Sequence, residues 1–465
     1  MATQQKRSAL TVFSLTMITV GSVDSIRNLP STALFGSQLI FFFILGAVFF
    51  LIPCALVSAE LSSTYPKQGG IYIWVKEAFG KRMGFLAIWL QWIENVIWYP
   101  TLLSFVAGTL GYLIAPDIAE TPGFLITVIM LAFWGATAIN LLGMKSSAFF
   151  SSLCTMTGLL LPMSLIISLG FAWLLSDKPL QISFDFNSIM PHLDDKESWT
   201  SLTAIMLSFC GIEIATVHAA DVENPQQAFP RSLAYSVIII LATLILGSLA
   251  IAIVLPHDNI SLVAGIMQAF DAFFSAYNVK WIMPLVAIML IMGGLGSVNN
   301  WIIAPTKGLL VAAEDGELPK SLEVTNEYGA PTNLLIIQAV IVSILCIVFL
   351  VLPTIKSAYW FLTELAAQLY MLMYLLMFVT AIVLRLRAPN KSAAFKIPGG
   401  TVGLIFVCLI GIIGTLTTIC ISFFPPSDVS NIPVFKYFCW LFACLLLMCV
   451  PPFIIKERKV KESFS

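Results

Sequence analysis

Apolar stretches of about twenty residues recur along the whole chain, and each is long enough to form one membrane-spanning helix. Since helices and closed barrels alone satisfy the backbone inside a bilayer, these lengths predict an all-α integral membrane protein. Only 11% of the residues are charged, against ~25% in an average soluble protein. We expect about twelve spans, at residues 10–35, 38–62, 83–113, 123–142, 147–175, 199–219, 232–255, 281–313, 332–352, 358–387, 401–424 and 433–455.

The distribution of Lys and Arg predicts which side of the membrane each connection occupies. With the N-terminus inside, about 18 of the 24 Lys and Arg residues lie in segments placed in the cytoplasm, and about 5 lie outside. Both termini are therefore expected in the cytoplasm, as tails at residues 1–9 and 456–465. The first apolar stretch continues past Pro30 without a cleavage site, so no cleavable signal peptide is expected.

The first span contains a polar run, residues 21–27, with one glycine, two serines, an acid and a base. A charged side chain at the bilayer centre costs at least ~2.5–3.5 kcal/mol, so Asp24 and Arg27 are expected to face protein or water. Unwound backbone is tolerated at that depth only where it is buried or lines a cavity, which predicts a discontinuous helix. The alternative is an intact helix on which Asp24 and Arg27, three residues apart, neutralise each other.

A similar interruption occurs in the sixth span. Gly211 and Glu213 break an apolar helix within residues 208–215. Breaks five spans apart are expected if residues 10–175 and 199–387 are two five-helix repeats of inverted topology. Residues 401–455 then supply two additional helices.

Other polar residues inside the spans allow more than one interpretation. Glu94 in span three is either a proton or substrate group, or a structural partner for a donor such as Arg27. For Glu364 in span ten a structural role is favoured, and Glu60 is expected to be a satisfied carboxylate at a helix end. The run 293–301, with three glycines, Asn299, Asn300 and Trp301, predicts close helix contact or the wall of a cavity.

Two connections predicted on the cytoplasmic side have structure of their own. Residues 69–80 place apolar side chains at helical spacing before Gly80, which predicts an amphipathic helix at the membrane interface. Residues 312–319 are typical of a helix end followed by a turn.

Several protein classes are excluded by what the sequence lacks. None of the nine Cys forms a C-x-x-C pair, so neither disulfides nor a metal site is expected. Motifs for a metalloprotease, a serine hydrolase or a nucleotide-binding loop are missing, which predicts that the chain is not an enzyme and has no cofactor. The net charge of −1 argues against nucleic-acid binding. The expected partners are a small molecule and membrane lipid.

Several short motifs together resemble the amino acid–polyamine–organocation (APC) transporter superfamily, and most of all its bacterial glutamate/γ-aminobutyrate antiporter branch. The similarity extends from Leu10 to about Phe453. Its motifs are Leu51-Ile52-Pro53 with Ala59-Glu60, Gly69-Gly70-x-Tyr72-x-Trp74-Val75, Gly211-Ile212-Glu213, Glu223-Asn224-Pro225, Gly296 to Trp301, and Phe395-Lys396-Ile397-Pro398-Gly399-Gly400.

This resemblance implies the LeuT-like fold of five plus five inverted helices with two extra helices, in the bacterial inner (plasma) membrane. It implies that exposed amides of Gly21, Ser22 and Val23 receive the substrate carboxylate. Carbonyls of Phe209, Cys210 and Gly211 would receive its amino group. Glu213 would serve in gating and proton response, and Trp301 would lie against the substrate side chain.

The chain departs from the family pattern at Asp24 and Arg27, where the family more usually has apolar or aromatic residues. Arg27 could grip an acidic side chain through two parallel hydrogen bonds, and Asp24 could hold an amine. Together with Glu94, these residues would set side-chain choice. Glu94 and Glu213 are the candidates for proton coupling.

The function predicted from the sequence is secondary active transport of amino acids by alternating access, as an antiporter of the glutamate/γ-aminobutyrate type. A proton-coupled symporter is the first alternative, and protons are then a second partner. A non-translocating sensor or scaffold is an alternative of a different class, although a receptor would want a soluble signalling domain. A monomer and a homodimer both fit the sequence.

Overall fold

The computed structural model describes residues 11–65, 67, 69–142, 156–176, 178–191, 199, 202–215, 225–389, 391–393, 395–426 and 432–455. The predicted tails, 1–9 and 456–465, lie outside these residues, as do parts of the fifth and sixth predicted spans and the Glu223-Asn224 motif. Over the described ranges the regular structure is helical, apart from one isolated bridge between Thr325 and Pro331.

Ten helices in the described chain are long and apolar enough to cross a membrane, so this is a multi-pass all-α membrane protein. They match ten of the twelve predicted spans. In chain order they comprise α3 and α4 (Leu39–Gly46 and Ile52–Thr64), α6 (Lys81–Ile114), α7 (Pro122–Leu141), α9 (Leu161–Leu174), α14 (Pro225–Val254), α16 (Met283–Glu314), α17 and α18 (Thr332–Leu345 and Val348–Val351), α19 (Ile355–Arg387), α20 (Gly400–Ile421), and α21 and α22 (Val434–Cys449 and Pro451–Ile454).

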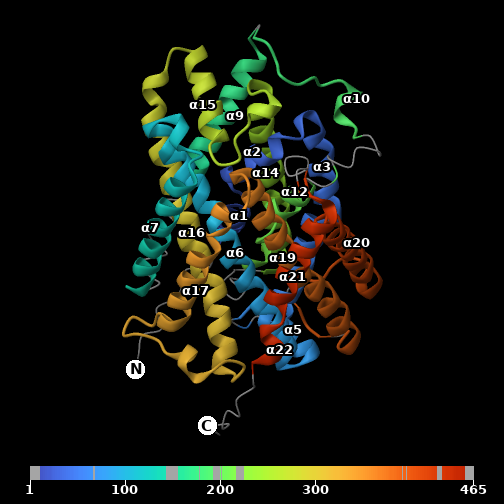
Figure 1. Ribbon diagram of the computed structural model, residues 1–465. Helices are drawn as coiled ribbons and strands as arrows, with labels where there is room; N and C mark the ends of the chain where they lie inside the picture. The colour runs from blue at the N-terminus through green and yellow to red at the C-terminus, as the bar shows by residue number, and fades with distance from the viewer. Residues whose placement is uncertain are drawn as a thin grey trace, which may run out of the picture.

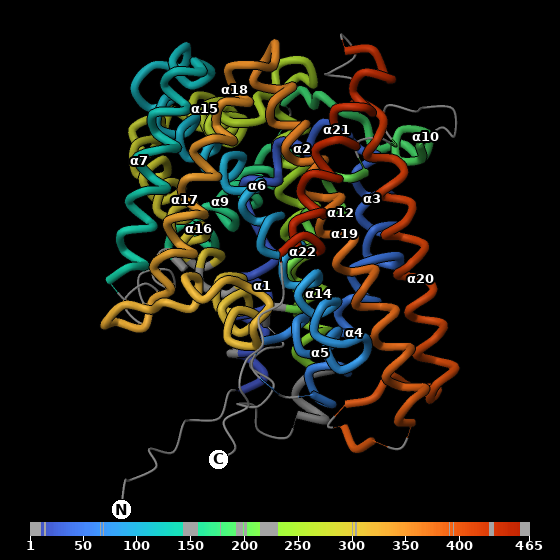
Figure 2. Tube along the Cα trace, turned by 60° about the horizontal axis from the view of Figure 1, so that its bottom comes forward, coloured from blue at the N-terminus to red at the C-terminus, as the bar shows by residue number. Residues whose placement is uncertain are grey.

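The two remaining predicted spans are broken, as the sequence predicted. The first consists of α1 (Val12–Val23), a 3-10 turn (Ile26–Asn28) and α2 (Leu29–Ala33). The sixth consists of α12 (Leu202–Ser208) and α13 (Ile212–Ala215). The broken first span runs through the middle of the bundle, whereas α7 and α20 lie on opposite flanks (Figures 1 and 2).

Helix contacts recur with an offset of five spans. Span one packs on span seven and span six on span two; span three packs on span ten and span eight on span five. Spans four and eight are in contact, and so are spans nine and three. Spans three and eight are also in contact, as are spans four and nine, and a shift of five gives each of these two pairs again. Shifting every span number by five therefore turns each of these contacts into another observed contact, which supports two equivalent repeats. Each repeat would cross the membrane five times, an odd number, so the second repeat starts from the opposite side. The boundaries 10–175 and 199–387 stay a prediction.

Short helices cover the two ends of the bundle (Figure 1). At one end lie α10 (Phe186–Ile189) and α15 (Gly265–Ala276); at the other lie α5 (Ile71–Phe79) and α22. We call the second end the α5 face, which the charge distribution predicts to be cytoplasmic. A helix within the predicted residues 69–80 is confirmed, as α5, whereas its place at the membrane interface stays a prediction. Six of its nine residues are buried and it packs on α6 and α19, so it covers protein.

Ionic contacts join the helices at the α5 face. Asp315, directly after α16, accepts hydrogen bonds from the Tyr72 hydroxyl and the Lys76 ammonium of α5. Nearby, Glu60 at the end of α4 accepts from Arg385 of α19 and from the Ile397 amide, at 2.8 Å. The prediction of a satisfied carboxylate at Glu60 is confirmed, and the Phe395–Gly400 motif is thereby fixed to the second span.

The contacts of Asp315 predict a loss of stability in acid. Burial would raise the pKa of Asp315, but the hydrogen bonds from Lys76 and Tyr72 outweigh it and hold the pKa below its usual value. A carboxyl group whose pKa is lower in the folded than in the unfolded protein stabilises the fold fully at pH values above its unfolded-state pKa of about 3.9. This stabilisation disappears as the pH falls through the folded-state pKa.

We therefore expect Asp315→Asn to cost about 1 kcal/mol at neutral pH, because the group is partly exposed, and to cost little in strong acid. Thermal unfolding in detergent at about pH 7 and about pH 3 measures this difference. The control is Glu314→Gln, which removes the neighbouring exposed carboxylate. Equal destabilisation by Asp315→Asn at both pH values would contradict the interpretation.

Candidate functional site

The two broken spans touch each other at their interruptions. Gly211, at the break of span six, has a φ of +106°, a value that favours glycine. A Cβ atom at this position would lie 2.8 Å from the Trp301 ring and 2.9 Å from the Ser22 carbonyl oxygen. The Gly211 amide donates to the Tyr374 hydroxyl of α19 at 2.9 Å. Only a residue without a side chain allows this contact among spans one, six and eight.

The break in span one lies later than the sequence suggested. Gly21, Ser22 and Val23 form the last turn of α1, and only Asp24 and Ser25 leave the helical conformation before the 3-10 turn. The amides of Gly21, Ser22 and Val23 are therefore used inside α1, and the prediction that they are exposed is wrong for this conformation. The amides of Ile26 and Arg27, at the start of the second half, lack the preceding helical turn that would supply their carbonyl partners, and the next amide, of Asn28, donates to the Ser25 carbonyl at 3.1 Å.

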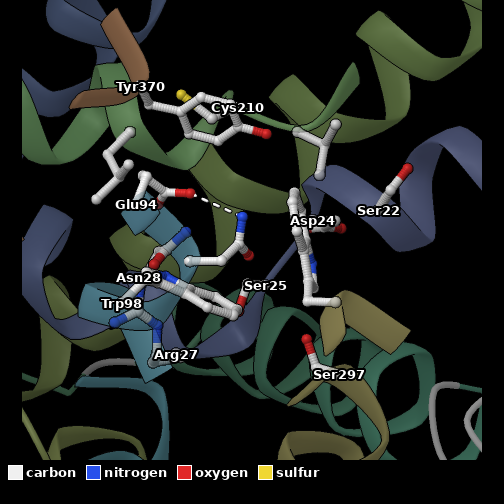
Figure 3. Close-up of a pocket in the computed structure, with 14 residues that line it drawn as sticks. Ser22, Asp24, Ser25, Arg27, Asn28, Glu94, Trp98, Cys210, Ser297 and Tyr370 are labelled. Carbon is white, nitrogen blue, oxygen red and sulfur yellow. Dashed lines mark hydrogen bonds between the residues drawn. The ribbon is translucent and has the colours of Figure 1, made fainter. Parts of the chain in front are cut away.

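A polar cavity lies beside these breaks, between spans one, three, six, eight and ten (Figure 3). Seven of the ten residues predicted for the substrate line it: Ser22, Val23, Asp24, Arg27, Glu94, Cys210 and Trp301. Gly21 lines an adjoining cavity, which shares Asp24, Ser25, Arg27 and Ser297 with the first. The two spaces therefore meet at the break.

Two predicted residues, Phe209 and Gly211, line neither cavity. The Phe209 ring is buried against Phe43, with ring centroids 5.6 Å apart. Gly211 instead allows the close contact described above. Cys210, between them, does line the cavity. The expectation that the backbone carbonyls of residues 209–211 receive the substrate amino group stays a prediction.

Arg27 brings a positive charge to the cavity and is 2% exposed. Its Nη1 donates to the Thr101 hydroxyl at 2.9 Å and to the Tyr359 hydroxyl at 3.4 Å. The guanidinium lies over the Trp98 ring, 5.1 Å from its centroid, while its Nε has no hydrogen-bond partner. Hydroxyls and aromatic rings thus hold the side chain, and no carboxylate in the described chain forms an ion pair with it.

Asp24 brings a carboxyl group to the same cavity and is 5% exposed. Neither carboxylate oxygen makes a hydrogen bond of normal geometry, although the Thr243 hydroxyl and the Ser25 amide approach it. Among the described residues no ion pair joins Asp24 to Arg27. The alternative of an intact helix whose charges neutralise each other is therefore wrong, because the backbone break separates them.

Glu94 lies across the cavity from Asp24, as Figure 3 shows. Its Oε2 accepts a hydrogen bond from the side-chain amide of Asn95 at 3.0 Å. The Glu94 carboxyl group also interacts electrostatically with Arg27, without a direct ion pair. The cavity lining therefore carries two acids and one base. Because all three are buried and none is paired with another, a bound molecule with charges of both signs would complement them.

Glu213 lies outside both cavities but is connected to the main one. Its carboxylate accepts hydrogen bonds from the Tyr370 hydroxyl at 2.7 Å, from the side-chain amide of Gln91 at 2.9 Å, and from the Tyr374 hydroxyl. Tyr370 lines the cavity, and Tyr374 accepts from the Gly211 amide. One carboxylate therefore ties spans three, six and ten together behind the cavity wall.

Span eight contributes an aromatic wall rather than an amide pair. Trp301 lies beside Trp98, with ring centroids 5.8 Å apart. Asn299 accepts a hydrogen bond from the Asn140 side-chain amide at 2.6 Å and lines a separate, apolar cavity between α6, α7 and α16, so it does not line the charged cavity. The Asn300 side chain lies outside the described side chains. The predicted close contact is confirmed by the glycines, since a Cβ on Gly158 would lie 2.2 Å from the Gly293 nitrogen.

Sequence reasoning missed several residues of the lining. Asn95 and Trp98 follow Glu94 by one and four positions, and Tyr370 lies one helical turn from Tyr374. Polar side chains and ring hydroxyls at one-turn spacing in an otherwise apolar helix could have indicated that this helix face lines a cavity. The residues missed are Ser25, Asn28, Asn95, Trp98, Leu207, Ser297 and Tyr370.

Two interrupted helices that meet at a charged cavity inside a multi-span bundle define the class of secondary transporters with discontinuous helices. Residues 10–450 match the family described as amino acid permease, and the chain belongs to this family of the APC superfamily. The resemblance found in the sequence motifs is thereby confirmed.

The relatives of the chain are named as transporters. An uncharacterized transporter of Legionella pneumophila is 43% identical over 459 residues, which cover 99% of both chains. A glutamate/gamma-aminobutyrate antiporter of Lactococcus lactis is 27% identical over 97% of this chain and 91% of the relative. A probable agmatine/putrescine antiporter of the same species is 22% identical over 84% of this chain and 83% of the relative.

The contact at Gly211 makes a specific prediction about folding. Gly211→Ala adds a methyl group that strains the backbone and clashes with Trp301 and the Ser22 carbonyl, so we expect a loss of about 1–3 kcal/mol. Gly135→Ala is the matched control, because a Cβ at Gly135 meets no atom within 4 Å. Thermal unfolding of the purified proteins in detergent compares them, and equal stability of the two variants would contradict the assigned contact.

Proposed function

We propose that the chain is a secondary active transporter that exchanges amino acids across the bacterial plasma membrane by alternating access. The observation that carries this proposal is the pair Asp24 and Arg27, a buried acid and a buried base that border one cavity without pairing with each other. Asp24 is ionised when a bound amino group supplies its counter-charge. A zwitterionic amino acid offers one partner for each.

We place the substrate carboxylate near Arg27 and the backbone amides of Ile26 and Arg27. Arg27 supplies a planar donor whose Nε is unused, and backbone amides at the break can donate to a negative charge. The amino group goes to Asp24 and to the carbonyl end of α1, whose last turn is formed by Gly21, Ser22 and Val23. Cys210 and Trp301 then contact the remainder of the substrate.

We further propose exchange of the glutamate/γ-aminobutyrate type, because antiporters of that name are similar over almost the whole chain. The lining holds one cation and two acids, so an acidic substrate requires Asp24 or Glu94 to be protonated when it binds. Side-chain choice is therefore coupled to the protonation of these acids. We assign Glu213 to gating, since it joins three spans behind the cavity.

Reconstituted vesicles test exchange directly. We expect labelled glutamate or γ-aminobutyrate to enter only vesicles preloaded with an unlabelled amino acid, because an exchanger returns loaded in both directions. Uptake into empty vesicles driven by a pH gradient alone would identify a proton symporter. No uptake of any amino acid, by protein that is correctly folded, would favour a sensor or scaffold.

Arg27→Gln tests the proposed carboxylate contact. A hydrogen bond to a charged group contributes about 1.5–3 kcal/mol, so we expect uptake at low substrate concentration to fall roughly 10- to 100-fold. Arg27→Lys keeps the charge but loses the planar fork, and its uptake should be intermediate. The control is Arg231→Gln, an exposed arginine on α14. Unchanged uptake by Arg27→Gln would remove Arg27 from the site.

A further inference from the structure

A second group of polar side chains lies outside both cavities, where α12, α19, α20 and α21 converge. At its centre is Glu364 on α19, which is 0% exposed. Neither of its carboxyl oxygens makes a hydrogen bond of normal geometry. The sequence favoured a structural role for Glu364, but such a role requires partners that hold the carboxyl group in place.

The other buried glutamates outside the cavity show what a structural carboxylate looks like in this protein. Glu60 accepts from Arg385 and from the Ile397 amide, and Glu213 accepts from two tyrosines and Gln91. Native structures satisfy nearly all of their buried polar groups, so an exception needs an explanation. Glu317, a further buried glutamate outside the cavity, accepts from Arg82 at 3.3 Å. Among these described glutamates, Glu364 is the exception, because neither of its carboxyl oxygens has a hydrogen-bond partner.

The surroundings of Glu364 contain no cation in the described chain. From α12 the Thr203 hydroxyl approaches it, and from α21 it faces the Tyr437 phenol, whose oxygen has no hydrogen-bond partner. The nearby Gln368 of α19 donates to Ser422, next to α20, at 2.7 Å. Among the described residues, the titratable side chain that interacts with Glu364 is Tyr437. The acids on other helices that pack on α19 have partners elsewhere: Glu60 with Arg385, Glu94 with Asn95, and Glu213 with Tyr370 and Gln91.

A buried ionised carboxylate without a counter-charge costs several kcal/mol, and such a group is neutral instead. Deprotonation of Glu364 would require water to reach it, which means that a neighbouring helix must move. Among its neighbours, α12 is short and ends at the break of span six, where Leu207 and Cys210 line the cavity. Thr203 lies one helical turn before Leu207.

We propose that Glu364 is a proton-binding site that couples proton uptake and release to the displacement of α12. With the proton bound, α12 packs on α19 and the cavity is closed. When α12 moves away, water reaches the carboxyl group and accepts the proton, and the return of α12 requires a proton to be taken up again. The coupling to substrate movement rests on the proposed transport function, whereas the proton site itself does not.

Glu364→Gln tests the coupling, because glutamine has the shape of the protonated acid and cannot titrate. With γ-aminobutyrate on both sides of the membrane, a substrate that does not require Asp24 or Glu94 to be protonated, we expect exchange in wild-type vesicles to change roughly tenfold between about pH 5 and about pH 8. The variant should change less than about twofold. Glu327→Gln, at an exposed loop acid, is the matched control and should behave as the wild type. A variant with the wild-type pH dependence would overturn the coupling while leaving the transport function intact.

Infrared spectroscopy of the purified protein tests the proton site without any transport. A protonated carboxyl group has a carbonyl stretching band that an ionised one lacks, and we expect Glu364→Gln to remove one such band at neutral pH. An unchanged band would overturn the proposal, even if no amino acid is transported. If Glu364→Gln does not fold, Glu364→Asp replaces it: a shifted band supports the site and an unshifted one refutes it.

Discussion

The structure depends on the requirement that every backbone polar group inside the bilayer be satisfied by the protein. A helix can stop at that depth only where another element receives its free groups. Here each interrupted span is next to the other: the Gly211 amide reaches Tyr374, and its Cα lies against the Ser22 carbonyl and the Trp301 ring. The surrounding helices hold these two breaks together, and the charged cavity is a consequence of their meeting.

Keeping Asp24 and Arg27 apart has a cost that the rest of the site reduces. Arg27 is held by the Thr101 and Tyr359 hydroxyls and by the face of Trp98, so its charge is stabilised without being neutralised. Asp24 has no comparable support. A pair that neutralised itself would leave nothing for a ligand to bind, whereas unpaired charges increase the affinity for a molecule that supplies both signs.

The sequence predicted the spans, both breaks, the helix at residues 69–80 and the environment of Glu60, because each follows from a local pattern of apolar, small and charged residues. It placed the first break too early, since helical backbone hydrogen bonding continues to the Asp24 amide, which donates to the Val20 carbonyl at 2.7 Å. The pairing of Asn299 with Asn140 was also missed. That pairing depends on the packing of distant spans, which no local pattern encodes.

The crossing of Gly158 and Gly293 has a consequence for how proteins of this architecture can diversify. Both residues border the cavity that adjoins the charged site, and a Cβ on either would overlap the backbone of the other. The distance between the two spans at this point is therefore set by the contact of their backbones. Single substitutions of the residues that select the ligand leave this distance between the spans unchanged. New specificities can therefore evolve stepwise while the arrangement of the helices stays constant.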